Sequence, residues 1–166
     1  MNRRTFSQRL ALGAAAWWVA SSRYALPPKR LLRPSRLREG QTVGLIAPAS
    51  QISDEKLEKA VTNLESLGLK VQLGQHVRKR HGSFAGTDQE RLSDIHEMFA
   101  NPAIDAVWCV RGGYGTTRLL PNINYRLIKK NPKPFIGYSD VTALHIALGQ
   151  RAGLVTFHGP VAASVG

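Results

Sequence analysis

Three observations predict an α/β fold with a doubly wound, mostly parallel sheet for residues 39–166. Runs rich in β-forming residues alternate along the chain with stretches whose apolar residues recur at helical spacing. One run, residues 104–110, is apolar almost throughout, as is typical of a strand buried on both faces of a parallel sheet. The helical stretches are long enough for right-handed crossovers between parallel strands. Together these features indicate the layers of Rossmann and flavodoxin-like domains, in which sites form where strands end and helices begin.

The first strand and helix are predicted from local signals. Residues 41–47 form a β-rich run that is ended by Pro48. Ser53 or Asp54 can cap the helix that follows, and Gly68 ends it. The apolar positions of this helix recur at helical spacing and are Leu57, Val61, Leu64 and Leu67.

The second unit begins with a short strand over residues 69–73. A polar loop rich in bases and glycine follows over residues 76–87. Asp88 is expected to cap the next helix. The apolar residues of that helix are Leu92, Ile95 and Phe99.

The remaining elements complete the alternation. After the buried strand 104–110, a glycine-rich turn and a helical stretch lead to a strand over residues 134–137. Residues 140–150 again show helical spacing, and residues 154–157 predict the last strand. This succession supports one α/β domain, which is the size that a chain of 166 residues accommodates.

Most of the positive charge lies before this domain. The formal net charge is +12, but nine of the 23 basic residues precede Glu39 with no acid among them. The 14 bases that remain face 11 acids, so residues 39–166 carry a net charge near +3. Because this part has no basic stripe with interleaved aromatic residues, a nucleic-acid partner is not predicted. The nine early bases are Arg3, Arg4, Arg9, Arg23, Lys29, Arg30, Arg33, Arg36 and Arg38.

No pattern for a metal or a cofactor is present. Cys109 is the only cysteine, which excludes an internal disulfide and a cysteine-based metal site. The spacing of His76, His81 and His96 resembles no metal-ligand motif. We therefore expect neither a metal nor a cofactor.

Residues 1–22 resemble a twin-arginine export signal. Arg3 and Arg4 precede Phe6, and the apolar run 10–20 that follows is too short to cross a bilayer as a helix. An ordinary secretory signal and an uncleaved anchor are the alternatives. Each of the three predicts a protein that works in the periplasm, or tethered to the membrane and facing outward.

Residues 23–38 predict a linker between this signal and the domain. The segment is basic and contains Pro27, Pro28 and Pro34, a composition that fits a linker better than a packed element. The predicted organisation is therefore a signal over 1–22, a linker over 23–38 and a domain over 39–166.

Two strand ends carry residues suited to chemistry. Gly112, Gly113 and Gly115 follow the buried strand, and without side chains there the backbone N–H groups can face a ligand or a developing negative charge. The alternative is that these glycines only form a tight turn.

At the second strand end, Ser139 stands between Gly137 and the helix that begins near Asp140. A sharp strand-to-helix turn would lift the serine hydroxyl clear of the backbone, as in a nucleophile elbow, although Val141 occupies the place of the usual second glycine. The alternative is that Ser139 is only an N-cap. A nucleophile elbow predicts a sparsely populated backbone conformation at Ser139, whereas a cap does not.

Several motifs in order resemble the LD-carboxypeptidases, serine peptidases that remove the terminal D-amino acid from murein tetrapeptides. The resemblance rests on AVWCVRGGYG at 106–115, IGYSDVTALH at 136–145 and FHGP at 157–160, and extends to GLIAPAS at 44–50 and to AGTD at 85–88 with Arg91. It implies that Ser139 is the nucleophile and that the backbone N–H groups of Gly113 and Asp140 form the oxyanion hole. It also implies a murein peptide as substrate and D-alanine as the released residue.

The sequence departs from that family in length. Family members are about twice as long, and their second domain carries the glutamate and histidine that complete the Ser-His-Glu triad. The sequence ends at Gly166, before such a domain, so the chain alone is expected to be inactive or weakly active. His145 lies about 240° around a helix from Ser139 and is expected to face away or to pack. His158 ends the last predicted strand, but the resemblance implies that the base does not come from this His-Gly-Pro segment.

The resemblance leaves other functions open. A microcin-immunity peptidase of the same family would cleave a peptidyl-nucleotide amide, whereas a non-catalytic murein-binding module or a gene remnant would cleave nothing. An apolar face is also expected where the second domain would dock, and a chain that exposes such a face can self-associate, for example as a homodimer.

Overall fold

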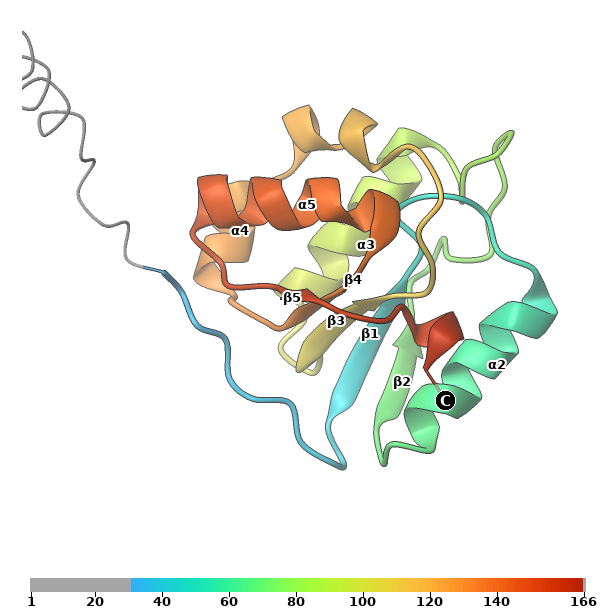
Figure 1. Ribbon diagram of the computed structural model, residues 1–166. Coiled ribbons are helices and arrows are strands. Elements are labelled where there is room, and N and C mark those ends of the chain that lie inside the picture. The colour runs from blue at the N-terminus through green and yellow to red at the C-terminus, as the bar shows by residue number, and fades with distance from the viewer. Residues whose placement is uncertain (1–30, 166) are drawn as a thin grey trace, which may run out of the picture. The chain divides into compact units, whose positions relative to one another are not determined.

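The computed structural model describes residues 31–165, and its core is a five-stranded parallel sheet with strand order β2-β1-β3-β4-β5 (Figure 1). The predicted signal and the linker up to residue 30 lie outside the described residues. In chain order the strands and α-helices are β1 (Thr42–Ile46), α2 (Asp54–Glu65), β2 (Lys70–Leu73), α3 (Asp88–Ala100), β3 (Ala106–Cys109), α4 (Tyr125–Lys130), β4 (Phe135–Gly137), α5 (Thr142–Ala147) and β5 (Phe157–His158). The predicted α/β fold with a parallel sheet is confirmed. Among the described residues, no helix is long and apolar enough to cross a membrane.

Helices cover both faces of the sheet. Figure 1 shows α2 on one side and α3, α4 and α5 on the other. Leu57, Ala60 and Leu64 of α2 belong to one apolar cluster, and α3, α4 and α5 contribute to a second. The buried strand β3 contributes residues to both clusters, since Trp108 belongs to the first and Cys109 to the second. Burial also raises the pKa of the Cys109 thiol, since desolvation disfavours the thiolate.

The strand order places a topological switch point between β1 and β3. The chain leaves β1 toward α2 on one face and leaves β3 toward α4 on the other face. The loops that follow these two strands therefore diverge and leave a crevice at the carboxyl edge of the sheet. The same edge receives the end of β4, which is paired with β3.

The two helix starts differ in how well they were predicted. Ser53 caps α2, because its side chain accepts a hydrogen bond from the backbone N–H of Lys56. The prediction that Asp88 caps α3 was wrong, since Thr87 is the N-cap. Thr87 and Glu90 form a capping box in which each side chain accepts from the other residue's backbone N–H. Asp88 is thereby left within the first turn, where its carboxylate is available to arginines.

The last helix and strand are less regular than predicted. The helical stretch 140–150 consists of a 3₁₀ turn (Ser139–Val141), α5 and a π-helical turn (Leu148–Ala152). The strand predicted over 154–157 is shifted, because β5 comprises only Phe157 and His158.

The end of the predicted linker contacts the domain. The backbone N–H of Leu32 donates to Gly153 at 2.8 Å, and Leu32 accepts from the N–H of Val155 at 2.9 Å. Leu37 packs against the apolar cluster on the α2 face. Residues 31–38 thus belong to the packed structure, in which they line the segment leading into β5.

Candidate active site

Ser139 occupies a strained corner between β4 and α5. Its φ is 65°, and it is the only residue other than glycine with a positive φ in the described part of the chain. A non-glycine residue held in this region costs about 1–3 kcal/mol, so the surrounding structure must hold it there. The strained backbone predicted for a nucleophile elbow is confirmed.

The side chain of Ser139 does not cap the helix that follows. The residue is exposed, and within residues 31–165 its hydroxyl has no hydrogen-bond partner. The N-cap position of the 3₁₀ turn is held by Tyr138, which makes no side-chain cap bond. The geometry therefore favours the elbow over the plain N-cap and leaves the hydroxyl accessible to a general base.

The glycine-rich turn after β3 approaches this corner closely. A Cβ on Gly112 would lie 2.9 Å from the Ser139 Cβ and 3.2 Å from the Tyr138 carbonyl oxygen. A Cβ on Gly113, whose φ is 127°, would lie 2.3 Å from the Ser50 Oγ. Gly112 and Gly113 are therefore needed because neighbouring residues approach their backbone closely. The alternative that these glycines only form a tight turn does not account for these contacts. The backbone N–H of Gly113 makes no hydrogen bond within the described residues.

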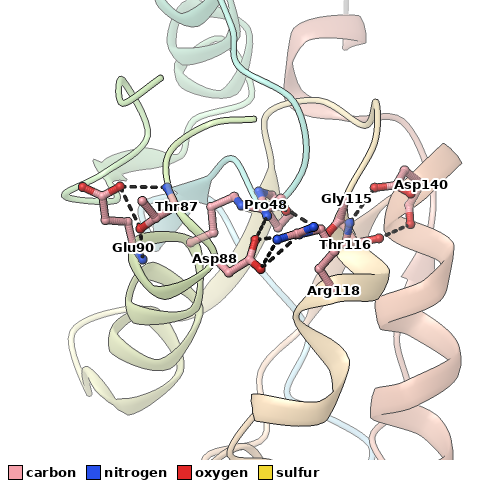
Figure 2. A network of polar contacts seen from close by, with 9 residues as sticks. Pro48, Thr87, Asp88, Glu90, Gly115, Thr116, Arg118 and Asp140 are labelled. Carbon is pink, nitrogen blue, oxygen red and sulfur yellow. Dashed lines mark hydrogen bonds and ion pairs between the residues drawn. The ribbon is translucent and has the colours of Figure 1, made fainter. Parts of the chain in front are cut away.

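Hydrogen bonds fasten the turn to its neighbours. The Ser50 Oγ after β1 accepts from the Tyr114 backbone N–H at 3.1 Å. The Thr116 N–H donates to the Asp140 carboxylate at 2.9 Å, and the Thr116 hydroxyl donates to the Asp140 carbonyl at 2.6 Å (Figure 2). The position of the Asp140 backbone next to Ser139 is thus held from the β3 loop. Thr116 carries no local signal of this role, because its partner Asp140 lies 24 residues away in the chain.

A buried arginine joins the loops after β1 and β3. Arg91 of α3 is 1% exposed, and its guanidinium donates to the carbonyls of Pro48 at 2.7 Å and Gly115 at 3.3 Å. Asp88 accepts hydrogen bonds from Arg91 at 2.5 Å and from Arg118 at 3.0 Å. Figure 2 shows Pro48, Asp88 and Gly115 close together around these hydrogen bonds. The hydrogen bonds from Arg118 and Arg91 hold the pKa of Asp88 below its usual range. Arg91 was part of the recognised motifs, and the structure shows what it holds together.

A cavity of about 440 Å³ opens beside Ser139. Gly112 and Gly113 line it together with Ser139, so the crevice at the switch point brings together the two strand ends singled out in the sequence. Lys56 and Arg111 also line it and make its wall basic. The cavity can therefore hold an anionic ligand next to the serine hydroxyl.

Neither histidine near the corner is placed as a base for Ser139. His145 is 9% exposed, and its Nε2 lies 2.8 Å from the Gly137 carbonyl oxygen. Desolvation lowers the pKa of His145, and its buried Nδ1 has no partner within the described residues. The expectation that His145 packs is confirmed. His158 is exposed on β5, with its ring 6.5 Å from that of Tyr138 and no hydrogen bond to Ser139.

The other histidines have structural contacts or lie away from a ligand cluster. His76 Nδ1 lies 2.7 Å from the Asp94 carboxylate, and His96 accepts a hydrogen bond from the Asn124 N–H. In residues 31–165, no group of three or more histidine, cysteine or acidic side chains is arranged to hold a metal ion.

The chain is similar in sequence to known carboxypeptidases. A probable murein peptide carboxypeptidase of Bacillus subtilis is 52% identical over 129 residues, covering 78% of this chain and 40% of that protein. The murein tetrapeptide carboxypeptidase of Pseudomonas aeruginosa is 47% identical over 125 residues, covering 75% of this chain and 40% of that protein. This chain thus spans about two fifths of the length of the curated relatives it matches.

The solved structures agree with the sequence relatives. An MccF-like protein from Bacillus anthracis superposes with a TM-score of 0.77 at 35% identity, covering 81% of this chain and 42% of that chain. Residues 43–159 match the family described as the LD-carboxypeptidase N-terminal domain, and they include the strained serine and both glycines of the crevice. The chain therefore belongs to the LD-carboxypeptidase family and carries that family's N-terminal domain.

Proposed function

We propose that this chain supplies the nucleophile domain of a serine LD-carboxypeptidase that removes the terminal D-alanine from murein tetrapeptides. The observation that carries the proposal is Ser139, a strained and exposed serine whose hydroxyl lies beside a glycine-lined cavity. The names of the relatives from Bacillus subtilis and Pseudomonas aeruginosa support a murein peptide as the substrate.

The reaction is an acyl transfer through Ser139. A general base takes the hydroxyl proton as Oγ attacks the carbonyl carbon of the scissile amide, and the tetrahedral intermediate carries a negative oxygen. Collapse of the intermediate breaks the C–N bond, D-alanine leaves with the proton on its amine, and water then hydrolyses the acyl-serine. The N–H groups of Gly113 and Asp140 are the proposed donors to the negative oxygen, each worth about 3–4 kcal/mol of transition-state stabilisation.

The general base is proposed to come from outside residues 31–165. By resemblance to the family, a glutamate and a histidine of a second domain complete the triad with Ser139. The absence of a hydrogen-bond partner for the Ser139 hydroxyl within the described residues supports this division. We use the term assembled enzyme for this chain combined with a second domain of the family.

Release of D-alanine from a murein tetrapeptide tests the proposal. The 166-residue chain alone is expected to release little, and adding the second domain of the Bacillus subtilis relative is expected to restore cleavage. Ser139→Ala should lower the restored kcat by about 10⁶-fold, because the nucleophile is lost. Ser93→Ala, at an exposed position on α3, serves as the matched control and should retain activity. Rapid release by the Ser139→Ala assembly would overturn the assignment.

A second activity is favoured by the match to the MccF-like structure. A microcin-immunity peptidase would use the same serine on a peptidyl-nucleotide amide, so the assembled enzyme should be given both substrates. Preference for the peptidyl-nucleotide would favour this alternative. Binding of murein peptide with no cleavage of either substrate by the assembly would instead favour a non-catalytic binding module.

We also propose that the protein is exported to the periplasm through the twin-arginine pathway. The proposal rests on Arg3 and Arg4 ahead of a short apolar run, in a segment outside the described residues. Replacing both arginines with lysine should abolish periplasmic delivery, because the receptor reads the arginine pair. Unchanged delivery in fractionated cells would reject the pathway.

A further inference from the structure

Basic side chains from three separate segments gather next to the Ser139 cavity. Lys56 at the start of α2 and Arg111 in the loop just after β3 line this cavity and also an adjoining hollow of about 320 Å³. Arg80, from the loop between β2 and α3, lines the adjoining hollow. We call Lys56, Arg80 and Arg111 the basic rim. The two hollows share Ile52 and two members of the basic rim, so they form one continuous surface.

We propose that the basic rim binds the terminal α-carboxylate of the peptide substrate, with Arg111 as its central contact. The proposal rests on the proposed carboxypeptidase function, because a carboxypeptidase must distinguish a free chain end from an internal residue. It adds the residues that would make this distinction.

Arg111 is held in a position suited to an incoming anion. Its Nη1 donates to the Gln51 carbonyl at 3.0 Å and its Nε to the Gly112 carbonyl at 3.2 Å, and the side chain is half-buried. These bonds fix the guanidinium against the loops after β1 and β3 without using a carboxylate. A guanidinium held in this way loses little side-chain entropy when it binds a carboxylate, and its planar donors match the two carboxylate oxygens.

The basic rim has no acid of its own. None of its three members forms an ion pair with another described residue. The nearby Asp54 is engaged by Arg78, and Asp88 is engaged by Arg91 and Arg118. Among the three, Arg111 is half-buried, and a partly desolvated positive charge without an internal partner favours an anion supplied from solution. The position of the rim beside Ser139 indicates that this anion belongs to the reacting molecule.

Another basic hollow in the described structure provides a comparison. Arg126 and Lys130 of α4 line a hollow on the opposite face of the sheet from α2, and no proposed catalytic residue contributes to it. This hollow differs from the basic rim in two ways. Ser139 does not line it, and it has no arginine that is held by hydrogen bonds to backbone carbonyls. Arg126→Gln is therefore a matched charge-removal control.

The test compares a tetrapeptide that ends in D-alanine with the same peptide that ends in D-alaninamide. Binding to the 166-residue Ser139→Ala chain is measured by NMR titration, and kcat/KM is measured in the assembled enzyme with intact Ser139. The free acid is expected to bind about 10–100-fold more tightly than the amide, the range for a hydrogen-bonded charged group. Arg111→Gln should remove this preference, Arg111→Lys should restore part of it, and Arg126→Gln should leave it unchanged.

One further variant helps to keep the outcomes separate. Because Arg111 also bonds Gln51, Lys56→Gln removes a charge from the rim at an exposed side chain without altering that loop contact, and it should reduce the preference partly. If the assembly cleaves neither substrate while Arg111 still governs the preference for the free acid in binding, the proposed function fails and the carboxylate site stands. Equal binding of acid and amide by the unsubstituted chain, or a preference that survives Arg111→Gln, would overturn the site.

Discussion

Gly113→Ala is expected to destabilise the protein by about 2–6 kcal/mol and to lower kcat of the assembled enzyme by about 10²–10³-fold. The φ of 127° costs an alanine about 1–3 kcal/mol of strain. The added Cβ would also lie 2.3 Å from the Ser50 Oγ and 2.5 Å from its Cβ, and overpacking of this kind costs about 1–3 kcal/mol. The turn must move away from Ser50, and the Gly113 N–H, a proposed oxyanion donor, moves with it. Urea denaturation and D-alanine release measure the two effects.

Two variants separate the strain from the clash. Gly40→Ala also places an alanine at a positive φ, here 78°, with no atom within 4 Å of the new Cβ, so it should cost only about 1–2 kcal/mol and leave kcat unchanged. Adding Ser50→Gly to Gly113→Ala removes both clashing atoms and should recover part of the lost stability. Equal losses from Gly40→Ala and Gly113→Ala would show that the contact with Ser50 has no energetic weight.

Arg91→Met is expected to lower the free energy of unfolding by about 3–5 kcal/mol. Methionine keeps the apolar stem of the side chain but ends about where Nε lies, so the guanidinium carbon, which is 4.8 Å from the centre of the Phe84 ring, is lost. It also removes the donors to Pro48 and Gly115 and leaves these carbonyls without their buried partner. Urea denaturation at pH 7 should show a lower midpoint with an unchanged slope.

Arg118→Met is the matched control, because both arginines bind Asp88. The Arg118 side chain is 56% exposed, so solvent screens its ion pair and its loss should leave the urea midpoint almost unchanged. Similar losses from the two substitutions would mean that the ion pair to Asp88, and not the bridge between the two loops, accounts for the effect. A further drop in D-alanine release by folded Arg91→Met would show that the bridge also positions the site.

The elements of the fold could be predicted because their signals are local. Apolar spacing in residues 54–65 and the almost wholly apolar run at 104–110 report which faces are buried, and burial on both faces implies a parallel sheet. The Ser139 corner was also predictable, since a serine between a strand and a helix reads as an elbow or a cap. The errors occurred where neighbours compete. Thr87 displaced Asp88 as the cap because Thr87 and Glu90 have the Thr-x-x-Glu spacing of a capping box, in which two backbone N–H groups are satisfied instead of one.

The sequence by itself determined the alternation of strands and helices, the family and the serine corner, because each depends on residues close together in the chain. Only the tertiary structure decided which residues surround that serine. The strand order sets β3 between β1 and β4, and this arrangement brings Ser50 against Gly113 and Gly112 against Ser139. The bonds from Arg91 and Thr116, like the basic rim, join segments that are far apart in the chain. Such contacts follow from how the parallel strands are ordered and packed, which local periodicity does not encode.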